Sequence, residues 1–196
     1  MTRVFLLRHA ESEWNAAGLW QGQADPPLSE HGRREAAEAA PCLAGEVSRV
    51  VSSDLRRAAE TAGIIADVLG LAAPEYDPAL REIDVGAWSG LTSAQIEEGW
   101  PGGIELWRDG KDAGNAGEDR SSFRDRILAA VIGHASHAPA PLLIVTHGAA
   151  IGVVERHLGV HPGVPVPRLS GRWLTYDGEL RPAGDRVPLV SLEGKA

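Results

Sequence analysis

Short apolar runs recur along the chain, and each is flanked by charged or small residues. They lie at residues 4–7, 47–51 and 142–146. Short runs rich in Val, Leu and Ile predict strands that are buried on both faces of a sheet. Two more runs, at residues 173–176 and 179–181, are joined by Asp177-Gly178, a turn dipeptide that predicts a β-hairpin.

The longer stretches between these runs carry helix signals. Capping residues mark where four helices are expected to begin: Ser29, Ser53 or Asp54, Thr92 with Gln95, and the Ser121-Ser122 pair. We expect Pro41 to end or kink the first helix before residue 43, and Gly70 to end the second after residue 69. Apolar residues at helical spacing from 123 to 131 support the fourth helix, and another is expected from Gly148 onward.

The predicted strands and helices alternate along the chain. Such alternation is typical of a three-layer α/β/α domain with a mostly parallel central sheet, so we expect an α/β fold. A chain of 196 residues is long enough for one such domain, and we expect residues 1–196 to form it. Residues 86–125 break the rhythm because they are rich in Gly, Trp and charge. We expect them to be an insertion over the functional site.

The charge of the chain limits its partners. A net charge of −8 and a pI near 5.3 argue against binding to nucleic acid or to an anionic membrane, which needs a basic face. A small anionic substrate is compatible with a local basic pocket. No apolar stretch approaches the ~20 residues that span a bilayer, and Arg8 interrupts the N-terminal run, so we expect a cytoplasmic protein. The single cysteine, Cys42, permits no intrachain disulfide and is typical of a small core residue.

Two histidines directly follow predicted strands. Arg8-His9 comes after the first strand, and His147-Gly148 comes after the strand at residues 142–146. Ligands of open α/β sheets bind beyond the carboxyl ends of the strands, so both histidines are candidates for one site.

The residue types around these histidines suit phosphate chemistry. Arginine offers a rigid fork of donors for a phosphate dianion. A neutral imidazole nitrogen can attack phosphorus, and a second histidine can neutralise charge in the transition state. A carboxylic acid would complete the set by protonating the leaving oxygen and then accepting a proton from water.

An ordered set of motifs covers roughly the first 155 residues. The motifs are Leu7-Arg8-His9-Ala10-Glu11-Ser12 with Trp14-Asn15, Gln21-Gly22, Asp25 to Leu28 with Gly32, Ser52-Ser53-Asp54-Leu55-Arg56-Arg57-Ala58 with Thr61-Ala62, Leu80-Arg81-Glu82 with Gly86, and Val145-Thr146-His147-Gly148. Their order and content resemble the histidine phosphatase superfamily, whose fold is phosphoglycerate-mutase-like.

This resemblance implies a role for each matching residue. It makes His9 the phosphate-accepting nucleophile and Glu82 the proton donor and later the base. The phosphate clamp would be Arg8, Arg57 and His147, with further phosphate contacts from Asn15, Gln21 and the backbone N–H of Gly148. It implies no metal ion and no cofactor. One departure is Ala10, where the family usually has glycine; alanine there would cost on the order of 1 kcal/mol if the backbone needed φ > 0.

Two other functions compete with a small-molecule phosphatase. A cofactor-dependent phosphoglycerate mutase shares the phosphohistidine, but it usually has a longer basic insertion, and only 64 residues separate Glu82 from His147. A non-catalytic phosphoprotein-binding module usually lacks the nucleophile or the acid, and this chain keeps both. The segment Gly86-Ala87-Trp88-Ser89-Gly90-Leu91 is similar to the phosphatase branches, so we favour hydrolysis.

The substrate is less constrained than the reaction. Residues 80–96, with 21–23 and 51–57, are similar to glucosyl-3-phosphoglycerate phosphatases, although general-purpose phosphatases share much of this pattern. Trp100 and Trp107 in the insertion could face a sugar, and Arg108, Arg120 and Arg124 could pair with a carboxylate. The alternative is that the tryptophans fill a small satellite core and the arginines are solvated. We expect a small, anionic phosphorylated metabolite; the sequence leaves a homodimer open.

Other polar residues have simpler interpretations. Glu11, Glu13 and Asp54 are expected to be solvated or capping residues. The remaining histidines are expected at the surface: His31, His134, His137, His157 and His161. His157 and His161 have i,i+4 spacing, but no glutamate follows the first as in a metalloprotease helix, so we do not expect a zinc site there.

Overall fold

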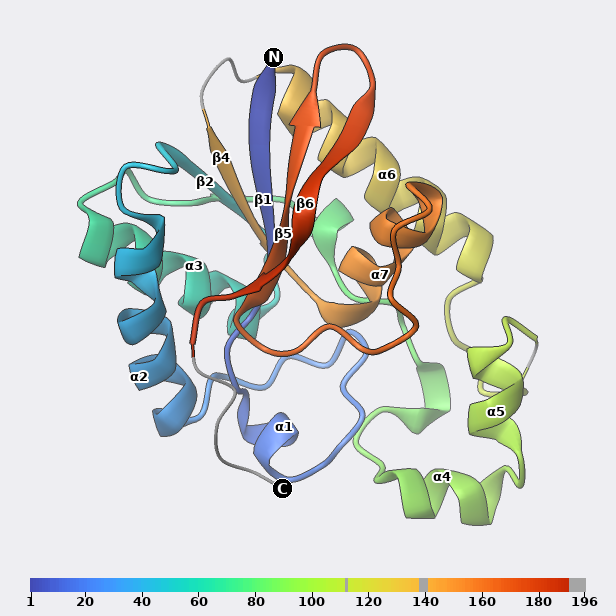
Figure 1. The fold of residues 1–196 in the computed structure, drawn as a ribbon. Coiled ribbons are helices and arrows are strands. Elements are labelled where there is room, and N and C mark those ends of the chain that lie inside the picture. The colour runs from blue at the N-terminus through green and yellow to red at the C-terminus, as the bar shows by residue number, and fades with distance from the viewer. Residues whose placement is uncertain (112, 138–140, 191–196) are drawn as a thin grey trace.

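The computed structural model describes residues 1–111, 113–137 and 141–190. These residues contain one six-stranded sheet in the order β3-β2-β4-β1-β5-β6 (Figure 1). The strands are β1 (Thr2–Arg8), β2 (Arg49–Ser52), β3 (Glu75–Tyr76), β4 (Leu142–Thr146), β5 (Ser170–Tyr176) and β6 (Leu180–Pro188). The first four strands in that order are parallel, and β5 and β6 are antiparallel. The expectation of a mostly parallel α/β sheet is therefore confirmed.

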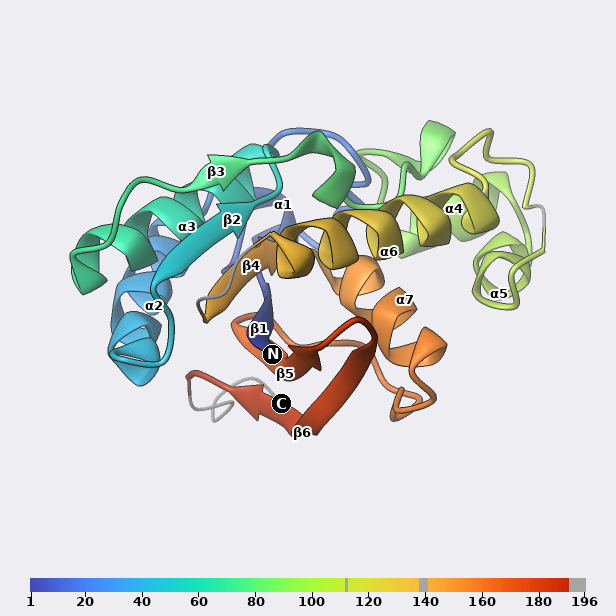
Figure 2. The ribbon, with the colours of Figure 1, turned by 90° about the horizontal axis from the view of Figure 1, so that it is seen from above.

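Helices cover both faces of the sheet. The helices of the described residues are α1 (Glu13–Ala16), α2 (Glu30–Ala39), α3 (Arg56–Leu69), α4 (Ser93–Gly99), α5 (Gly103–Arg108), α6 (Arg120–Ser136) and α7 (Gly148–His157), of which α2, α3, α6 and α7 form the outer layers. Viewed from above, α2 and α3 lie on one side of the sheet and α6 and α7 on the other (Figure 2). This arrangement is the predicted three-layer architecture.

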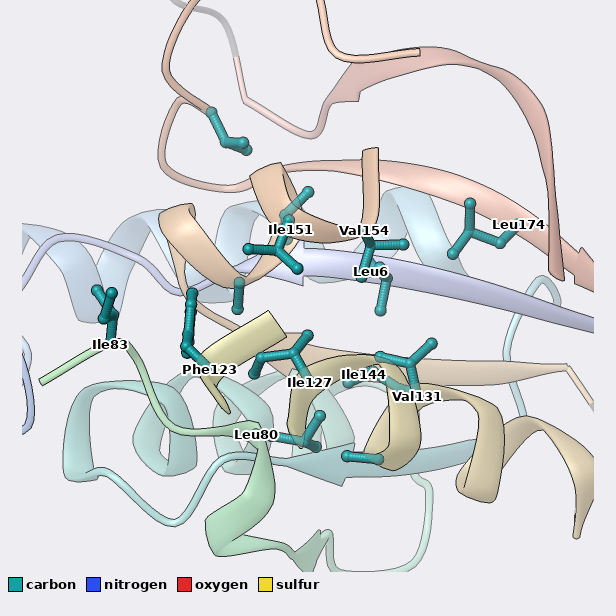
Figure 3. Close-up of a cluster of buried hydrophobic side chains, with 14 of the residues drawn as sticks. Leu6, Leu80, Ile83, Phe123, Ile127, Val131, Ile144, Ile151, Val154 and Leu174 are labelled. Carbon is teal, nitrogen blue, oxygen red and sulfur yellow. The ribbon is translucent and has the colours of Figure 1, made fainter. Parts of the chain in front are cut away.

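Alternate residues of the central strands feed two separate cores. In β1, Val4 and Leu6 face the α6–α7 side, whereas Phe5 and Leu7 face the α2–α3 side. Strand β4 repeats the alternation, which follows from the two-residue period of a strand. Figure 3 shows the first core, where side chains of α6 and α7 pack over Leu6. Burial on both faces explains why these strands read as continuous apolar runs.

Most predicted elements are present, with differences at their ends. Ser29 caps α2, Thr92 and Gln95 form a capping box at α4, and Gly70 ends α3 in the left-handed region with φ 64°. Pro41 converts the end of the first helix into a 3-10 turn over Ala40–Leu43. Strand β2 begins two residues later than expected, and the two-residue edge strand β3 was not predicted because it is too short to show a pattern.

Two predicted helix caps are wrong. Neither Ser53 nor Asp54 caps α3, because both side chains bond to groups distant in the sequence, and the N-cap is Leu55. Helix α6 begins after Asp119, whose carboxylate accepts from the backbone N–H of Ser122, so the cap lies two residues before the predicted serines. The hairpin of β5 and β6 is confirmed and is longer than predicted on both sides.

The segment 86–125 packs around a cluster of tryptophans. The ring of Trp107 lies edge-on to those of Trp20 and Trp88, with centroids 5.3 and 6.2 Å away. Trp88 is fully buried, and Trp100 packs against it. Trp100 and Trp107 are therefore core residues, but they pack against the main core on the α6–α7 side and do not form a separate satellite core. Within the described residues, no helix is both long and apolar enough to span a membrane.

Candidate active site

The sheet places the two candidate histidines side by side. Arg8 pairs with Thr146 in the parallel ladder of β1 and β4, so the next residue of each strand is a histidine at the same sheet edge. The backbone N–H of His9 donates to the Thr146 carbonyl oxygen at 3.0 Å. The ring centroids of His9 and His147 are 5.2 Å apart, and both residues are buried.

The ring of His9 is held in one tautomer. Its Nδ1 lies 2.7 Å from the backbone carbonyl oxygen of Ala10. Because a carbonyl oxygen only accepts, Nδ1 carries the hydrogen and Nε2 keeps its lone pair. Burial, with Arg57 and Arg8 nearby, lowers the pKa of His9 well below its ordinary value. The ring is therefore neutral near pH 7, and Nε2 is a competent nucleophile.

Two arginines lie near this ring, the buried Arg57 and the half-buried Arg8, and backbone carbonyls fix both. Arg57, near the start of α3, donates from Nη1 to Ala24 O at 2.7 Å and from Nη2 to Gly22 O at 2.8 Å. Arg8 donates from Nη1 to Val166 O at 2.6 Å. Burial lowers the pKa of Arg57 to about 10, so it remains charged at neutral pH.

The second histidine is anchored on one side only. Nε2 of His147 lies 2.9 Å from the hydroxyl oxygen of Ser53, a residue predicted as a helix cap. Nδ1 of His147 is buried and has no partner among the described residues. Burial, followed by Arg57 and His9, lowers the pKa of His147 well below its usual value.

Buried nitrogen atoms without partners gather at this site. Among the described residues, six buried side-chain nitrogen and oxygen atoms lack a hydrogen bond. Three of them are Arg8 Nε, Arg57 Nε and His147 Nδ1. Leaving buried polar atoms unpaired is costly, so several together indicate a place for an anionic ligand. Two positive guanidinium groups fit a phosphate dianion there.

Glu82 lies at the same edge of the sheet. Its two carboxylate oxygens accept from the backbone N–H groups of Ile83 and Ala149, at 3.0 and 3.1 Å. Its charge acts on Arg8 and Arg57 and opposes the lowering of their pKa values by burial. The structure thus brings the predicted acid, nucleophile and clamp together.

Arg126 positions the segment that carries Glu82, and sequence reasoning missed it. Its Nη1 donates to the carbonyl oxygens of Ala79 and Arg81 at 2.8 and 3.0 Å, and its other nitrogens bond to Glu118. Its position on α6 gives no signal of this role, because the acceptors are more than 40 residues away. The segment that carries Glu82 is thus fastened to α6 by several hydrogen bonds of one side chain.

The predicted additional phosphate contacts lie around the same loops. Asn15 and Gln21 are joined through Ser12: Asn15 Oδ1 accepts from the Ser12 backbone N–H at 3.2 Å, and Gln21 Oε1 accepts from the Ser12 hydroxyl at 2.9 Å. Their amide oxygens are therefore engaged, which leaves the NH₂ groups as donors for a ligand. Gly148 opens α7 next to Arg8, and a Cβ there would lie 3.5 Å from Arg8 Nε.

The replacement of glycine by alanine after His9 causes no backbone strain. Among the described residues, Ala116 and Leu169 are the non-glycine residues with positive φ, so Ala10 lies outside that region. Ala10 is fully buried, and its backbone N–H donates to Thr61 Oγ1 at 3.1 Å.

The predicted insertion arginines have three different environments. Arg120 stacks on the Trp107 ring at 4.3 Å and donates to the Trp107 carbonyl oxygen. Arg124 pairs with Asp125, and Arg108 is exposed at the end of α5. Arg120 and Arg124 line one cavity with Trp107, whereas the lining of that cavity does not include Arg108.

Some residues expected to be solvated or apolar are not. Glu11 is buried and pairs with Arg168 at 3.1 Å, and Asp54 is bidentate to Arg81. Cys42 is exposed rather than a core residue. Within the described ranges, no group of three His, Cys, Asp or Glu side chains is arranged to hold a metal ion.

Comparison with known families agrees with the sequence motifs. The family described as "Histidine phosphatase superfamily (branch 1)" matches residues 4–170. The glucosyl-3-phosphoglycerate phosphatase of Mycobacterium tuberculosis (strain CDC 1551 / Oshkosh) is 36% identical over 198 residues, covering 93% of this chain and 88% of the relative. A probable phosphoglycerate mutase GpmB of Yersinia enterocolitica is 37% identical and covers 83% and 77%.

Solved structures show the same fold. Mycobacterial glucosyl-3-phosphoglycerate phosphatase in complex with VO3 superposes with a TM-score of 0.77 at 32% identity, covering 88% of this chain and 90% of the other. Bacillus stearothermophilus YhfR superposes with a TM-score of 0.83 at 28% identity, covering 93% and 96%.

Proposed function

Since this chain belongs to the histidine phosphatase superfamily, branch 1, we propose that it hydrolyses a small phosphomonoester metabolite through a phosphohistidine on His9. The relatives named glucosyl-3-phosphoglycerate phosphatase, at 36% identity over most of both chains, support hydrolysis of a small phosphorylated substrate. The observation that carries the proposal is the neutral His9 ring, whose Nε2 is unprotonated beside two arginines.

The first step transfers the phosphoryl group to the protein. Nε2 of His9 attacks phosphorus, and the bond between phosphorus and the ester oxygen breaks. The leaving oxygen takes a proton from the Glu82 carboxyl group. Arg8, Arg57 and His147 hold the phosphoryl oxygens and offset the charge that they gain in the transition state.

The second step returns the protein to its starting state. Water attacks the phosphorus and gives a proton to the Glu82 carboxylate. The bond between phosphorus and Nε2 breaks, its electron pair returns to the ring, and inorganic phosphate leaves. Together, the two steps conserve atoms and protons and leave His9 and Glu82 as they began.

A phosphoglycerate mutase is the second candidate, because relatives named probable phosphoglycerate mutase are 37% identical to this chain. A mutase must hold the phosphorylated product while it reorients and must exclude water. Between Glu82 and α6, this chain has only a short segment with two small helices, α4 and α5, among its described residues. We favour hydrolysis, and release of inorganic phosphate from a phosphoglycerate without formation of its isomer distinguishes the two activities.

Trapping the intermediate tests the proposal. Rapid quenching during turnover of p-nitrophenyl phosphate, in excess EDTA, should yield an acid-labile phosphate bound to His9. His9→Ala should abolish turnover, with a loss of at least about 10⁴-fold, because removing the nucleophile closes the pathway.

The matched control is His31→Ala. His31 is an exposed histidine on α2 that pairs with Glu35, and its loss should leave turnover unchanged. Phosphate trapped on His147, or a strict need for added metal ion, would contradict the proposal.

A further inference from the structure

A cavity of about 410 Å³ lies next to the proposed catalytic acid. Its wall includes Ile83 and Ala149, the two residues whose backbone N–H groups bind the Glu82 carboxylate. Residues of α6 and α7 form most of the wall, and these two helices lie side by side in Figures 1 and 2. A substrate whose phosphate sits on the clamp could therefore extend its other end into this cavity.

The cavity has an apolar floor and a cationic rim. Ile83, Phe123 and Val153 are buried aliphatic or aromatic side chains in its wall. The polar lining residues are Arg120, Arg124, Arg156 and His157. Among the residues that the structure describes, no acidic residue lines it. This cluster of basic side chains contrasts with the net charge of −8 of the whole chain. It would attract an anion.

The side chain of Arg156 extends along α7 toward the preceding turn of the helix. Gly152, one turn earlier in α7, has no side chain, and a Cβ there would lie 3.3 Å from Arg156 Nη1. The neighbouring Glu155 does not pair with this guanidinium, because its carboxylate binds Arg172 and Arg186. Burial lowers the pKa of Arg156 from its ordinary value. Within the described part of the chain, the Arg156 guanidinium makes no hydrogen bond or ion pair.

Arg120 is fixed in place, yet one of its donors is free. Its guanidinium stacks on Trp107 at 4.3 Å and donates through Nη2 to the Trp107 carbonyl oxygen. Its Nε is buried and has no partner among the described residues. A guanidinium held by stacking loses little freedom when it binds a ligand. Arg120 and Arg156 line the same cavity, and repulsion from Arg156 adds to burial in lowering the pKa of Arg120.

From these contacts we propose that Arg120 and Arg156 form a second anion-binding site that selects phosphomonoesters carrying a second anionic group. Gly148, at the phosphate clamp, and Gly152, beneath Arg156, are four residues apart, which is about 6 Å along a helix. The second anion therefore belongs to the same small molecule as the phosphate. Arg124 adds charge at the rim, and Arg108 takes no part because it lies outside the cavity lining. This inference rests on the proposed phosphatase activity.

A matched pair of substrates tests the second site. 3-Phosphoglycerate and glycerol 3-phosphate share a phosphate and a three-carbon chain. The first carries a carboxylate at the position where the second carries a hydroxymethyl group. The wild-type chain should have the higher kcat/KM with 3-phosphoglycerate. Arg156→Ala should lower that value by about tenfold or more, mainly through KM, because a charge-assisted hydrogen bond is lost. The same variant should change kcat/KM for glycerol 3-phosphate and for p-nitrophenyl phosphate by no more than about twofold.

Two further variants separate a specific contact from a change in overall charge. Arg34→Ala removes a positive charge from the exposed face of α2. It should leave kcat/KM unchanged for both 3-phosphoglycerate and glycerol 3-phosphate. Arg156→Glu should lower kcat/KM for 3-phosphoglycerate further and raise it for phosphocholine, whose second group is a cation. Because Arg156 is exposed at the surface of α7, we expect both Arg156 variants to fold.

The outcomes distinguish this inference from the proposed function. Equal use of the two matched substrates by the wild type, or equal losses on all substrates in Arg156→Ala, would overturn the second site while His9-dependent turnover remains. Absence of turnover with p-nitrophenyl phosphate would instead overturn the proposed function itself.

Discussion

His9 and His147 are neutral for the same reason, but their ring nitrogens have different partners. Burial beside arginines lowers the pKa of both below 6.5. His9 donates from Nδ1 to a backbone carbonyl, which fixes its lone pair for attack. His147 has one nitrogen at Ser53 and the other unpaired. His147 Nδ1, which is buried and has no partner among the described residues, is therefore available to an anionic ligand.

We predict that phosphate binding draws a proton onto His147. The free site lowers the pKa of His147, so its ring is neutral at pH 7. A phosphate dianion in contact with the ring favours the charged form and raises that pKa. The complex then binds more protons than the separate partners near neutral pH. Calorimetric titration with inorganic phosphate, in two buffers of different ionisation enthalpy, measures this uptake.

The control for proton uptake is His147→Gln. The glutamine cannot take up a proton, so comparison with the wild type removes the titration of phosphate itself. Uptake should fall by up to one proton in the variant. Equal uptake by both proteins would show that His147 stays neutral in the complex.

At the scale of elements, the turn after Glu82 depends on a glycine. Gly86 has φ 54°, and a Cβ there would lie 2.1 Å from the backbone oxygen of Asn115. Ala87 N donates to the same oxygen at 2.8 Å, so the two backbone segments are in direct contact. The turn thereby holds the segment that carries Glu82 against the backbone of Asn115, in the loop that leads into α6.

We predict that Gly86→Ala destabilises the fold by about 3 kcal/mol or more, since it adds a backbone clash to the cost of a left-handed alanine. Gly70→Ala is the matched control. Gly70 also has positive φ, 64°, but nothing lies within 4 Å of the Cβ position, so about 1 kcal/mol is expected. Urea unfolding measures both values. Similar costs for the two variants would refute the predicted clash.

Elements with local causes could be predicted from sequence. The Ser29 and Thr92 caps and the Gly70 terminus depend on neighbours within a few residues, and all three are confirmed. The predicted caps at Ser53 and Asp54 are wrong because distant residues compete for those side chains. Asp54 binds Arg81, 27 residues away, and Ser53 binds His147, 94 residues away.

The candidate site divides in the same way. His9 and His147 could be placed together because both end strands of one sheet, which pattern alone predicts. The supporting contacts of Arg126 could not be predicted, since they depend on how α6 packs over residues 79–82. Arg156 was likewise not predicted as a binding residue, because only the packing of α7 beside α6 places it in a cavity.

At the scale of the whole molecule, a buried ion network joins α7 to the C-terminal hairpin. Glu155 is 1% exposed, and its Oε1 accepts from Arg172 Nε and Arg186 Nε at 2.9 and 2.7 Å. Arg186 also donates to the carbonyl oxygens of Val164 and Pro165. This loop continues to Val166, whose carbonyl oxygen holds Arg8, so the network supports the phosphate clamp from behind.

We predict that Glu155→Gln lowers the free energy of unfolding by about 3–5 kcal/mol, because it leaves two largely buried guanidinium groups without their counter-charge. Glu75→Gln is the control. Its pair with Arg49 is largely exposed, so its loss should cost at most about 1 kcal/mol. Thermal unfolding at pH 7 compares the two. A small effect at both positions would show that the network adds little to stability.

The position of β1 also affects how the chain emerges during synthesis. This strand comprises residues 2–8, yet in the finished sheet it lies between β4 and β5 (Figure 1). The nearer of these partners begins at Leu142, so more than 130 residues must be synthesised after β1 before it can pair. Until then its apolar side chains are open to wrong partners, including other nascent chains. Slowing translation between β1 and β4 should therefore increase aggregation rather than help folding.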